Sequence, residues 1–183
     1  MIVLVTGGAG YIGSHTCLAL LKEGHKLIVV DNLCSSSMDS IKRVEKISKK
    51  SIYFYKVDIN NKNELNNIFK KHTIDAVIHF AGLKILSKSI QNPIDYYKAN
   101  VAGSIILAEV MNKFNCKKLV FSSSASVYGD SLKVPICEDF PLKPQNPYAR
   151  SKLVSENFFQ DVFNSDPSWS IALLRYFNPV GAH

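Results

Sequence analysis

A tyrosine and a lysine stand four residues apart in the stretch from Asn146 to Leu153, which reads NPYARSKL. On a helix, residues with this spacing share one face, so Tyr148 and Lys152 are able to act as a pair. A phenol with a pKa near 10 is a poor base at neutral pH, and lowering that pKa to about 7 needs about 4 kcal/mol. A lysine charge roughly 4 to 6 Å away supplies about 3 to 4 kcal/mol at an effective dielectric constant of about 20, less its desolvation.

The spacing alone also fits an ordinary amphipathic helix, because a lysine-rich chain forms such pairs by chance. The surroundings of the pair favour chemistry. Asn146 is able to cap the helix and Pro147 suits its first position, so Tyr148 falls in the first turn. The preceding predicted strand ends in the serine-rich stretch FSSSASVYG, residues 121–129, whose hydroxyls are able to hydrogen-bond a substrate hydroxyl.

A glycine-rich turn near the start of the chain indicates the cofactor. Gly7, Gly10 and Gly13 form G-x-x-G-x-x-G between a predicted strand and a predicted helix, and this Cβ-free turn lets backbone N–H groups approach a pyrophosphate. Asp31 ends the next predicted strand, about 20 residues on, where a carboxylate holds both ribose hydroxyls of NAD and repels the 2′-phosphate of NADP. The alternative is a tight turn without a ligand, and the combined context favours an NAD site. The cationic ring of NAD⁺ and Lys152 would together lower the pKa of the catalytic tyrosine, which then removes a hydroxyl proton as hydride leaves the same carbon.

The elements that must position these residues alternate along the chain. Strand patterns cover 2–6, 26–31, 51–57, 75–81, 118–123 and 170–177, and helical patterns cover 11–23, 38–50, 61–71, 96–115 and 147–164. Near-continuous apolar strands separated by helices predict an α/β fold, a doubly wound, Rossmann-type parallel sheet with helices on both faces. We expect one NAD-binding domain over 1–183, with the irregular stretch 128–146 as an ordered loop over the site.

Ligands of such sheets bind at the carboxyl ends of the strands, which adds two further segments to the candidate site. Asp58 and Ile59 follow the third predicted strand. The fourth ends in Phe80, Ala81, Gly82, Leu83 and Lys84. Each segment also fits a plain exit from strand to loop.

The composition argues against several other functions. The net charge of +7 is carried almost wholly by scattered lysines, without the basic block and interleaved aromatics of a nucleic-acid surface. No apolar run approaches the roughly 20 residues of a membrane span, and the first residues predict a strand, not a signal peptide. The four cysteines form no C-x-x-C pair, so neither a metal site nor a disulfide framework is expected, and reduced thiols fit the cytoplasm.

Longer motifs carry a family resemblance: TGGAGYIGSH, VVDNL, HFAGLK, SSSASVYG, YARSK and LLRYFNPVGAH. Over the entire chain they resemble the extended short-chain dehydrogenase/reductase family, and within it the 4-epimerases of UDP-hexoses. The resemblance implies tightly held NAD, oxidation of C4 of the hexose to a ketone, rotation of the sugar and return of hydride to the opposite face. This interconverts UDP-glucose and UDP-galactose, a step of galactose metabolism. Family members continue into a smaller domain that grips the UDP group, so the 183-residue chain is expected to be poorly active alone.

The resemblance also implies a role for each matching residue. Tyr148 is expected to be the base, Lys152 its electrostatic partner and ribose ligand, and Ser124 the hydrogen-bonding aid at the C4 hydroxyl. The substrate is expected to contact Ser124, Tyr148 and Asn178, and Asn178 is expected to contact the diphosphate of the substrate. The expected cofactor-binding residues are Gly7, Gly10, Tyr11, Ile12, Gly13, Asp31, Asn32, Leu33, Cys34, Ser35, Ser36, Asp58, Ile59, Phe80, Ala81, Gly82, Leu83, Lys84, Asn100, Ser122, Tyr148, Lys152 and Phe177.

The sequence disfavours one close reaction and leaves others open. Sugar-nucleotide dehydratases carry an Asp-Glu pair just before V-Y-G, because dehydration needs an acid and a base. Here Ala125 and Ser126 stand at those positions and have no carboxyl group. The remaining alternatives are an epimerase of another nucleotide sugar and a non-catalytic NAD-binding module. A homodimer through the helices after the fourth and fifth strands is a further expectation from the resemblance.

Overall fold

The computed structural model describes residues 1–130 and 133–182, so positions 131, 132 and 183 of the predicted loop and domain lie outside the described residues. Within that part, one sheet has the order β3-β2-β1-β4-β5-β6, and every neighbouring pair is parallel. The order in which the chain adds strands to the sheet reverses between β1 and β4. The strands are β1 (Ile2–Thr6), β2 (Lys26–Asp31), β3 (Tyr53–Lys56), β4 (Ala76–His79), β5 (Lys118–Ser124) and β6 (Ser170–Tyr176). The predicted doubly wound sheet is confirmed.

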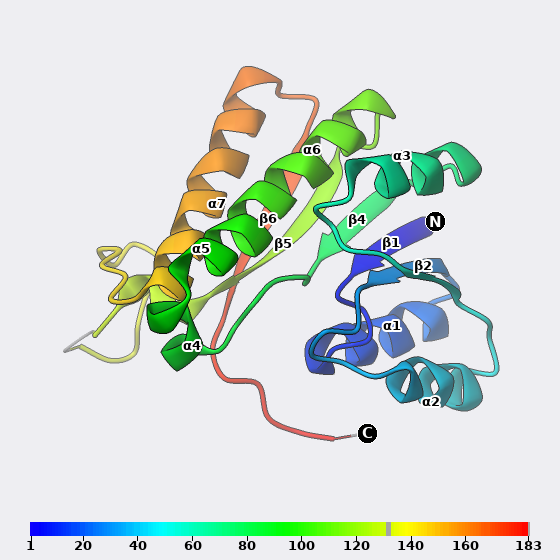
Figure 1. Ribbon diagram of the computed structural model, residues 1–183, viewed down its shortest axis with the longest axis horizontal. Coiled ribbons are helices and arrows are strands. Elements are labelled where there is room, and N and C mark those ends of the chain that lie inside the picture. Colours follow the sequence, from blue (N-terminus) through cyan, green and yellow to red (C-terminus); the bar gives the residue numbers. More distant parts are fainter. Residues whose placement is uncertain (131–132, 183) are drawn as a thin grey trace.

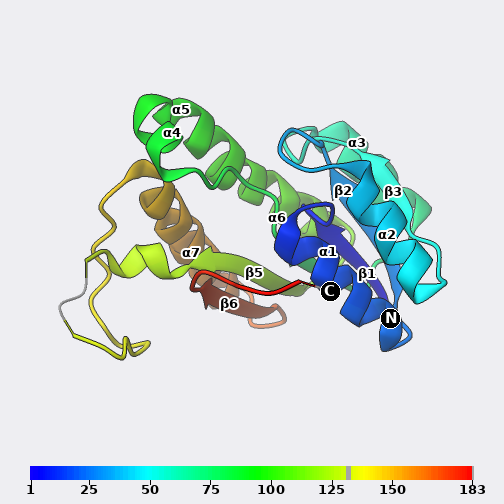
Figure 2. The ribbon, with the colours of Figure 1, turned by 90° about the horizontal axis from the view of Figure 1, so that it is seen from below.

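Helices lie on both faces of the sheet, as Figure 1 shows. One face carries α1 (Tyr11–Lys22) and α2 (Met38–Ser48), and the other carries α3 (Lys62–Lys71), α6 (Gly103–Lys113) and α7 (Pro147–Ser165). Each face has its own apolar core, centred on Val29 and Leu21 on the first side and on Phe121 and Phe159 on the second. Seen from below, no described helix covers β5 and β6 on the α1 side (Figure 2).

The stretch predicted as one helix over 96–115 differs from that prediction. It consists of α5 (Pro93–Tyr96), a π-helical segment η1 (Tyr97–Ala102) and α6, and a short helix α4 (Leu86–Gln91) precedes them. Asn92 interrupts the helical backbone and Pro93 begins α5, because proline suits the first position of a helix but not its interior. Six-residue α4 is too short for a helical period to stand out in the sequence.

The start of α7 follows the sequence closely. Asn146 is its N-cap, Pro147 its first residue, and the Asn146 side chain accepts a hydrogen bond from the Ala149 amide at 2.9 Å. Upstream, β5 runs into the 3-10 helix η2 (Ala125–Tyr128), and the loop after it returns to η2 through the Lys143 amide, which donates to the Val127 carbonyl at 3.0 Å. The carboxyl end of β5 and the first turn of α7 therefore meet.

Candidate functional site

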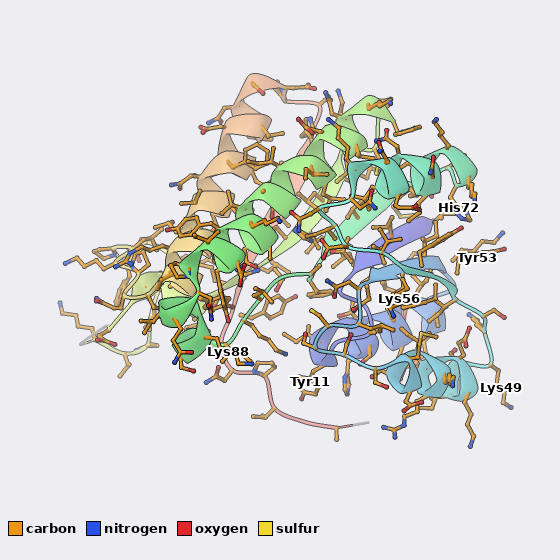
Figure 3. The ribbon with its side chains drawn as sticks, in the orientation of Figure 1. Tyr11, Lys49, Tyr53, Lys56, His72 and Lys88 are labelled. Atoms are coloured by element: carbon orange, nitrogen blue, oxygen red, sulfur yellow. The ribbon has the colours of Figure 1, made fainter. Side chains whose placement is uncertain are left out.

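A cavity of about 650 Å³ runs along the carboxyl ends of the strands, at the point where the winding of the sheet reverses. This is the place and the size at which α/β proteins bind a nucleotide-sized ligand. Its walls are the glycine turn, the strand exits and the first turn of α7. Tyr11, at the start of α1, lies beside the C-terminal segment (Figure 3), and its hydroxyl donates to the Gly181 carbonyl at 2.5 Å.

Most residues predicted for the site line this one cavity. They are Gly7, Gly10, Tyr11, Ile12, Gly13, Asp31, Asn32, Cys34, Ser35, Ser36, Asp58, Ile59, Phe80, Ala81, Gly82, Leu83, Lys84, Ser122, Ser124, Tyr148, Lys152, Phe177 and Asn178. Sequence reasoning missed Val30, Val57, Asn60, Leu86, Ala99, Ser123, Ala125, Ser126, Tyr176 and Pro179. All but Leu86, Ala99 and Ser126 adjoin residues already identified at strand exits, so the strand-end rule could have found them. No described residue of the loop 128–146 lines the cavity, and the predicted place of this loop over the site stays a prediction.

The glycine turn is packed too closely for side chains. Gly7 has φ +68°, and a Cβ there would lie 2.6 Å from the Ala81 amide nitrogen. A Cβ at Gly13 would collide with the Gly7 carbonyl oxygen. Gly10 is the N-cap of α1 and provides no side-chain hydrogen bond to the first turn. The helix N-terminus therefore faces the cavity with backbone N–H groups, the arrangement that binds pyrophosphate. The residues present fit a dinucleotide.

Asp31 organises the rim of the cavity next to this turn. Its carboxylate accepts hydrogen bonds from the Ala9 amide at 3.0 Å, the Leu33 amide at 2.9 Å and the Ser36 hydroxyl at 2.8 Å. Leu33 has φ +60°, and its side chain packs against the core beneath α1 and α2. The Leu33 side chain is therefore not part of the cavity lining, because an apolar side chain at this turn is better buried in the core, and its predicted cofactor contact stays a prediction.

A second carboxylate closes the far end of the cavity. Asp58 accepts from the Asn32 side chain at 2.8 Å and from the backbone and side chain of Asn60, each at 2.8 Å. Burial raises the pKa of Asp58, but these hydrogen bonds and the charge of Lys98 outweigh it, so the pKa is lowered. The group stays ionised and able to accept further hydrogen bonds.

Asn100 does not line the cavity itself, and its predicted role as a cofactor ligand stays a prediction. It is buried, and its side chain accepts from the Leu83 amide at 2.8 Å and donates to the Leu83 carbonyl at 3.0 Å and the Ser151 hydroxyl at 2.9 Å. Gly82, with φ +158°, permits this approach, since a Cβ there would lie 2.8 Å from the Asn100 side-chain oxygen. Asn100 therefore links α7 to the turn after β4 from below.

Tyr148, Lys152 and Ser124 come together where α7 meets β5. Lys152 is buried; its ammonium donates to the Ser122 carbonyl at 2.8 Å and lies 4.9 Å from the centre of the Phe121 ring. Burial lowers the pKa of Lys152 to about 8, against the opposing charge of Glu156. The ammonium is still mostly protonated at neutral pH.

The phenol itself differs from the expectation based on spacing. Burial raises the pKa of Tyr148, and the hydrogen bond from Ser124 only partly offsets this. The sequence predicted that Lys152 and NAD⁺ together lower the pKa of Tyr148. In the protein alone, Lys152 donates to the Ser122 carbonyl and does not lower the pKa of Tyr148. The Tyr148 ring packs edge-on against Tyr96, with 6.5 Å between ring centres.

A buried histidine lies below the site. The two ring nitrogens of His79 hydrogen-bond with the Thr6 hydroxyl at 2.6 Å and the Ser104 hydroxyl at 3.1 Å. Thr6 also accepts from the Ala81 amide at 3.3 Å, so this chain of bonds joins the ends of β1 and β4. Burial, with a smaller contribution from the Lys152 charge, lowers the pKa of His79 to about 3.

We expect the free energy of unfolding to fall as the pH drops below about 6.5, because the unfolded chain then binds a proton on His79 that the folded chain does not. With a folded-state pKa of about 3, the contribution of this group is lost at up to about 1.4 kcal/mol per pH unit until about pH 3. Denaturant unfolding at about pH 7.5, 6.5 and 5.5 measures the slope. His79→Asn should show a shallower slope, and equal slopes in the two proteins would contradict this account.

Two other kinds of site are absent from the described residues. Across 1–130 and 133–182, no group of three or more His, Cys, Asp or Glu side chains is arranged to hold a metal ion. In the same ranges, no helix has the length and apolar character needed to cross a membrane.

Comparison with known proteins gives a consistent result. The model of the NAD dependent epimerase/dehydratase family matches residues 3–183. The UDP-glucose 4-epimerase of Dictyostelium discoideum is 55% identical over 181 residues, which cover 99% of this chain and 53% of that protein. That of Bacillus subtilis (strain 168) is 50% identical over 183 residues, covering 100% of this chain and 54% of that protein. The chain thus spans about half the length of the curated relatives it matches.

A solved structure agrees in the backbone. The crystal structure of UDP-glucose 4-epimerase from Bifidobacterium longum, in complex with NAD⁺ and UDP, superposes with a TM-score of 0.98 at 48% identity. The match covers 100% of this chain and 55% of that one.

Proposed function

The chain belongs to the NAD dependent epimerase/dehydratase family, and from this premise we propose that it is the cofactor-binding half of a UDP-glucose 4-epimerase. The observation that carries the proposal is the single cavity that holds both the glycine turn and the group of Tyr148, Lys152 and Ser124. Relatives at 55% and 50% identity with that name support the choice of reaction. We propose the cytoplasm as its location and galactose metabolism as its setting.

NAD is the proposed cofactor. The turn at Gly7, Gly10 and Gly13 would hold its pyrophosphate, Asp31 a ribose, and Asp58 with Ile59 the adenine end. Bound NAD⁺ supplies a hydride acceptor and a positive charge. The neighbouring structure from Bifidobacterium longum was solved with NAD⁺ and UDP, which supports this choice.

The residues of this chain would divide the chemistry at C4 of the hexose among them. Ser124 hydrogen-bonds the C4 hydroxyl and Tyr148, as phenolate, takes the hydroxyl proton while the C4 hydrogen departs as hydride, leaving a C4 ketone. The Lys152 ammonium stabilises the phenolate. After the sugar turns over, the same phenol returns the proton to the C4 oxygen as hydride re-enters from the other face. Asn178 would hold the diphosphate of the substrate.

Purified whole protein tests this proposal when it is given NAD and UDP-glucose. We expect UDP-galactose to form with no net consumption of NAD. Calorimetry with NAD and then with UDP-glucose distinguishes the alternatives, because a non-catalytic NAD-binding module would bind the first compound and ignore the second. Turnover of a different UDP-sugar with no reaction of UDP-glucose would point to an epimerase of another nucleotide sugar.

We also propose that the protein forms a homodimer through α6, α7 and the short helices beside them. Apolar side chains are exposed on this side of the molecule: Ile90 by 66%, Ile94 by 80% and Val154 by 42%. Burying such a patch against a second copy removes its apolar surface from water.

Ile94→Asp should weaken the homodimer by at least about 100-fold, because an unpaired carboxylate would have to be buried in the interface. Sedimentation over a range of protein concentrations measures the change. The control is Ile47→Asp on α2, where the side chain is 46% exposed on the opposite face of the sheet. A wild-type protein that stays monomeric at all concentrations would refute the interface.

A further inference from the structure

Helix α7 is fastened to the sheet by one contact in each successive turn. Tyr148 and Ser124 line the same cavity, where Ser124 acts to lower the pKa of the phenol, and Lys152 donates to the Ser122 carbonyl at 2.8 Å. One turn further, the Glu156 carboxylate accepts a hydrogen bond from the Ser123 hydroxyl. The catalytic candidates of α7 and the serines of β5 therefore face each other in register, and Glu156 is the next group in the same row.

Glu156 is nearly fully buried, with 1% of its surface exposed, and its partner is Arg175 of β6. The guanidinium donates through Nε at 3.1 Å and through the outer nitrogen at 2.8 Å, a two-point pairing. Ser123 and Arg175 are directly paired residues of β5 and β6, so one carboxylate of α7 holds both strands. The other guanidinium nitrogen donates to the Tyr128 hydroxyl at 2.9 Å and to the Glu138 carbonyl at 3.3 Å.

This ion pair buries the Glu156 carboxylate almost completely and leaves the Arg175 side chain 20% exposed, so desolvation of the carboxylate makes it a poor choice for stability alone. Two residues earlier on the same face of the sheet, Phe121 and Leu173 pack against α7 as ordinary apolar core. Replacing a buried ion pair by apolar side chains of similar volume is often neutral or stabilising, since the desolvation of the charges is avoided. An apolar pair would not orient α7 relative to the sheet. The two hydrogen bonds between the guanidinium and the carboxylate do so, because they fix the angle of the helix and its position along β5.

We propose that Glu156 and Arg175 are positioning residues of the epimerase site: their ion pair holds α7 at the height on β5 where Tyr148 meets Ser124 and where Lys152 meets the Ser122 carbonyl. This inference rests on the proposed function for its catalytic consequence. Neither residue lines the cavity, so both act through the groups that do.

The charge of Glu156 also reaches Lys152. The charge of Lys152 is coupled to Glu156 of its own helix and to the neutral His79 of β4, and Arg175 of β6 holds the Glu156 carboxylate. Tyr148 lies one turn earlier on α7. Burial lowers the pKa of Lys152 to about 8 while Glu156 raises it. Removing the carboxylate charge therefore lowers the pKa of Lys152 below about 8 and leaves less of the ammonium protonated at neutral pH.

The test uses Glu156→Gln, which keeps the size of the side chain, in the whole protein with NAD and UDP-glucose. We expect kcat to fall by about 10- to 100-fold, since a misplacement near 1 Å costs about this much, with KM and NAD affinity within about threefold. The upper limb of the pH profile of kcat should move to lower pH. Ser123→Ala, which removes one bond only, should change kcat in the same direction by less, and Arg175→Lys should retain part of the activity.

Asp166→Asn is the matched control. It breaks an ion pair with Lys117, at 2.7 Å, at the far end of the same helix. This variant should keep kcat and its pH profile. The inference would be overturned if Glu156→Gln and Ser123→Ala both kept the wild-type kcat and the wild-type pH profile of kcat. A loss of kcat with an unmoved pH profile and a matching loss of stability would also overturn it, since a purely structural role predicts that result. If Glu156→Gln does not fold, kcat and its pH profile in Ser123→Ala decide whether the inference holds.

Failure of the proposed function is a separate outcome. If the wild-type protein binds NAD but epimerises nothing, the titration of ¹⁵N-labelled Lys152 still tests the geometry in this chain. A lower pKa of Lys152 in Glu156→Gln, with no change in Asp166→Asn, then supports the positioning role, and an unchanged pKa refutes it.

Discussion

Replacing Tyr148 by phenylalanine is expected to lower the rate of UDP-glucose interconversion by about 10³-fold or more, while NAD binding stays within about threefold. The substitution removes one hydroxyl group, and loss of a positioned acid–base group costs about 10²- to 10⁴-fold. The ring can keep its edge-on packing against Tyr96. The measurement is kcat of the whole protein with UDP-glucose and, separately, calorimetry with NAD.

Tyr96→Phe is the matched control for that experiment. The Tyr96 ring contacts the Tyr148 ring, but its hydroxyl donates to the Ile85 carbonyl at 2.5 Å and Tyr96 does not line the cavity. We expect this variant to lose about 1 kcal/mol of stability and to keep most of its activity. An equal loss of rate in the two variants, or an unchanged rate in Tyr148→Phe, would contradict the role given to Tyr148.

Local signals in the sequence account for most of the sheet and of the cavity. The strand periodicity, the glycine turn and the Asn146-Pro147 start of α7 each depend on residues close together in the chain, and the structure agrees with all three. Because parallel strands end at one edge, the order of the elements alone brings Asp31, Lys84 and Tyr148 to one cavity.

The sequence says least where tertiary contacts decide. Asn100 and Leu33 are neighbours of cavity residues in the chain, yet the Asn100 side chain bonds Leu83 and Ser151 below the cavity and the Leu33 side chain packs in the core. The π-helical turn η1 has no signature in the sequence. No pattern joined Glu156 to Arg175, because their pairing depends on how α7 lies across β5 and β6.

The pKa of Tyr148 also depends on tertiary structure that the spacing of residues does not reveal. The spacing to Lys152 correctly identified a charge one helical turn away, but burial of the phenol outweighs the effects that lower its pKa in the protein alone. At neutral pH a buried phenol with a raised pKa is protonated and offers little phenolate to act as a base.

The glycine turn carries the second large prediction, that Gly13→Ala weakens NAD binding by at least about 100-fold. The added Cβ would collide with the Gly7 carbonyl oxygen and lie 2.8 Å from the Gly8 Cα. Both are backbone atoms, so the turn must open and the N–H groups at the start of α1 must move away from the pyrophosphate. Calorimetry with NAD measures the binding, and overpacking is expected to lower the unfolding free energy by about 1 to 3 kcal/mol.

Gly24→Ala separates the loss of binding from a loss of stability. Gly24 closes α1 with φ +83° and has open space around its Cα, so alanine there meets backbone strain of about 1 to 2 kcal/mol but no collision. This variant should unfold more easily than wild type and bind NAD unchanged. If Gly13→Ala binds NAD as well as Gly24→Ala does, the pyrophosphate does not lie on this turn, and the dinucleotide would have to enter the cavity in another orientation.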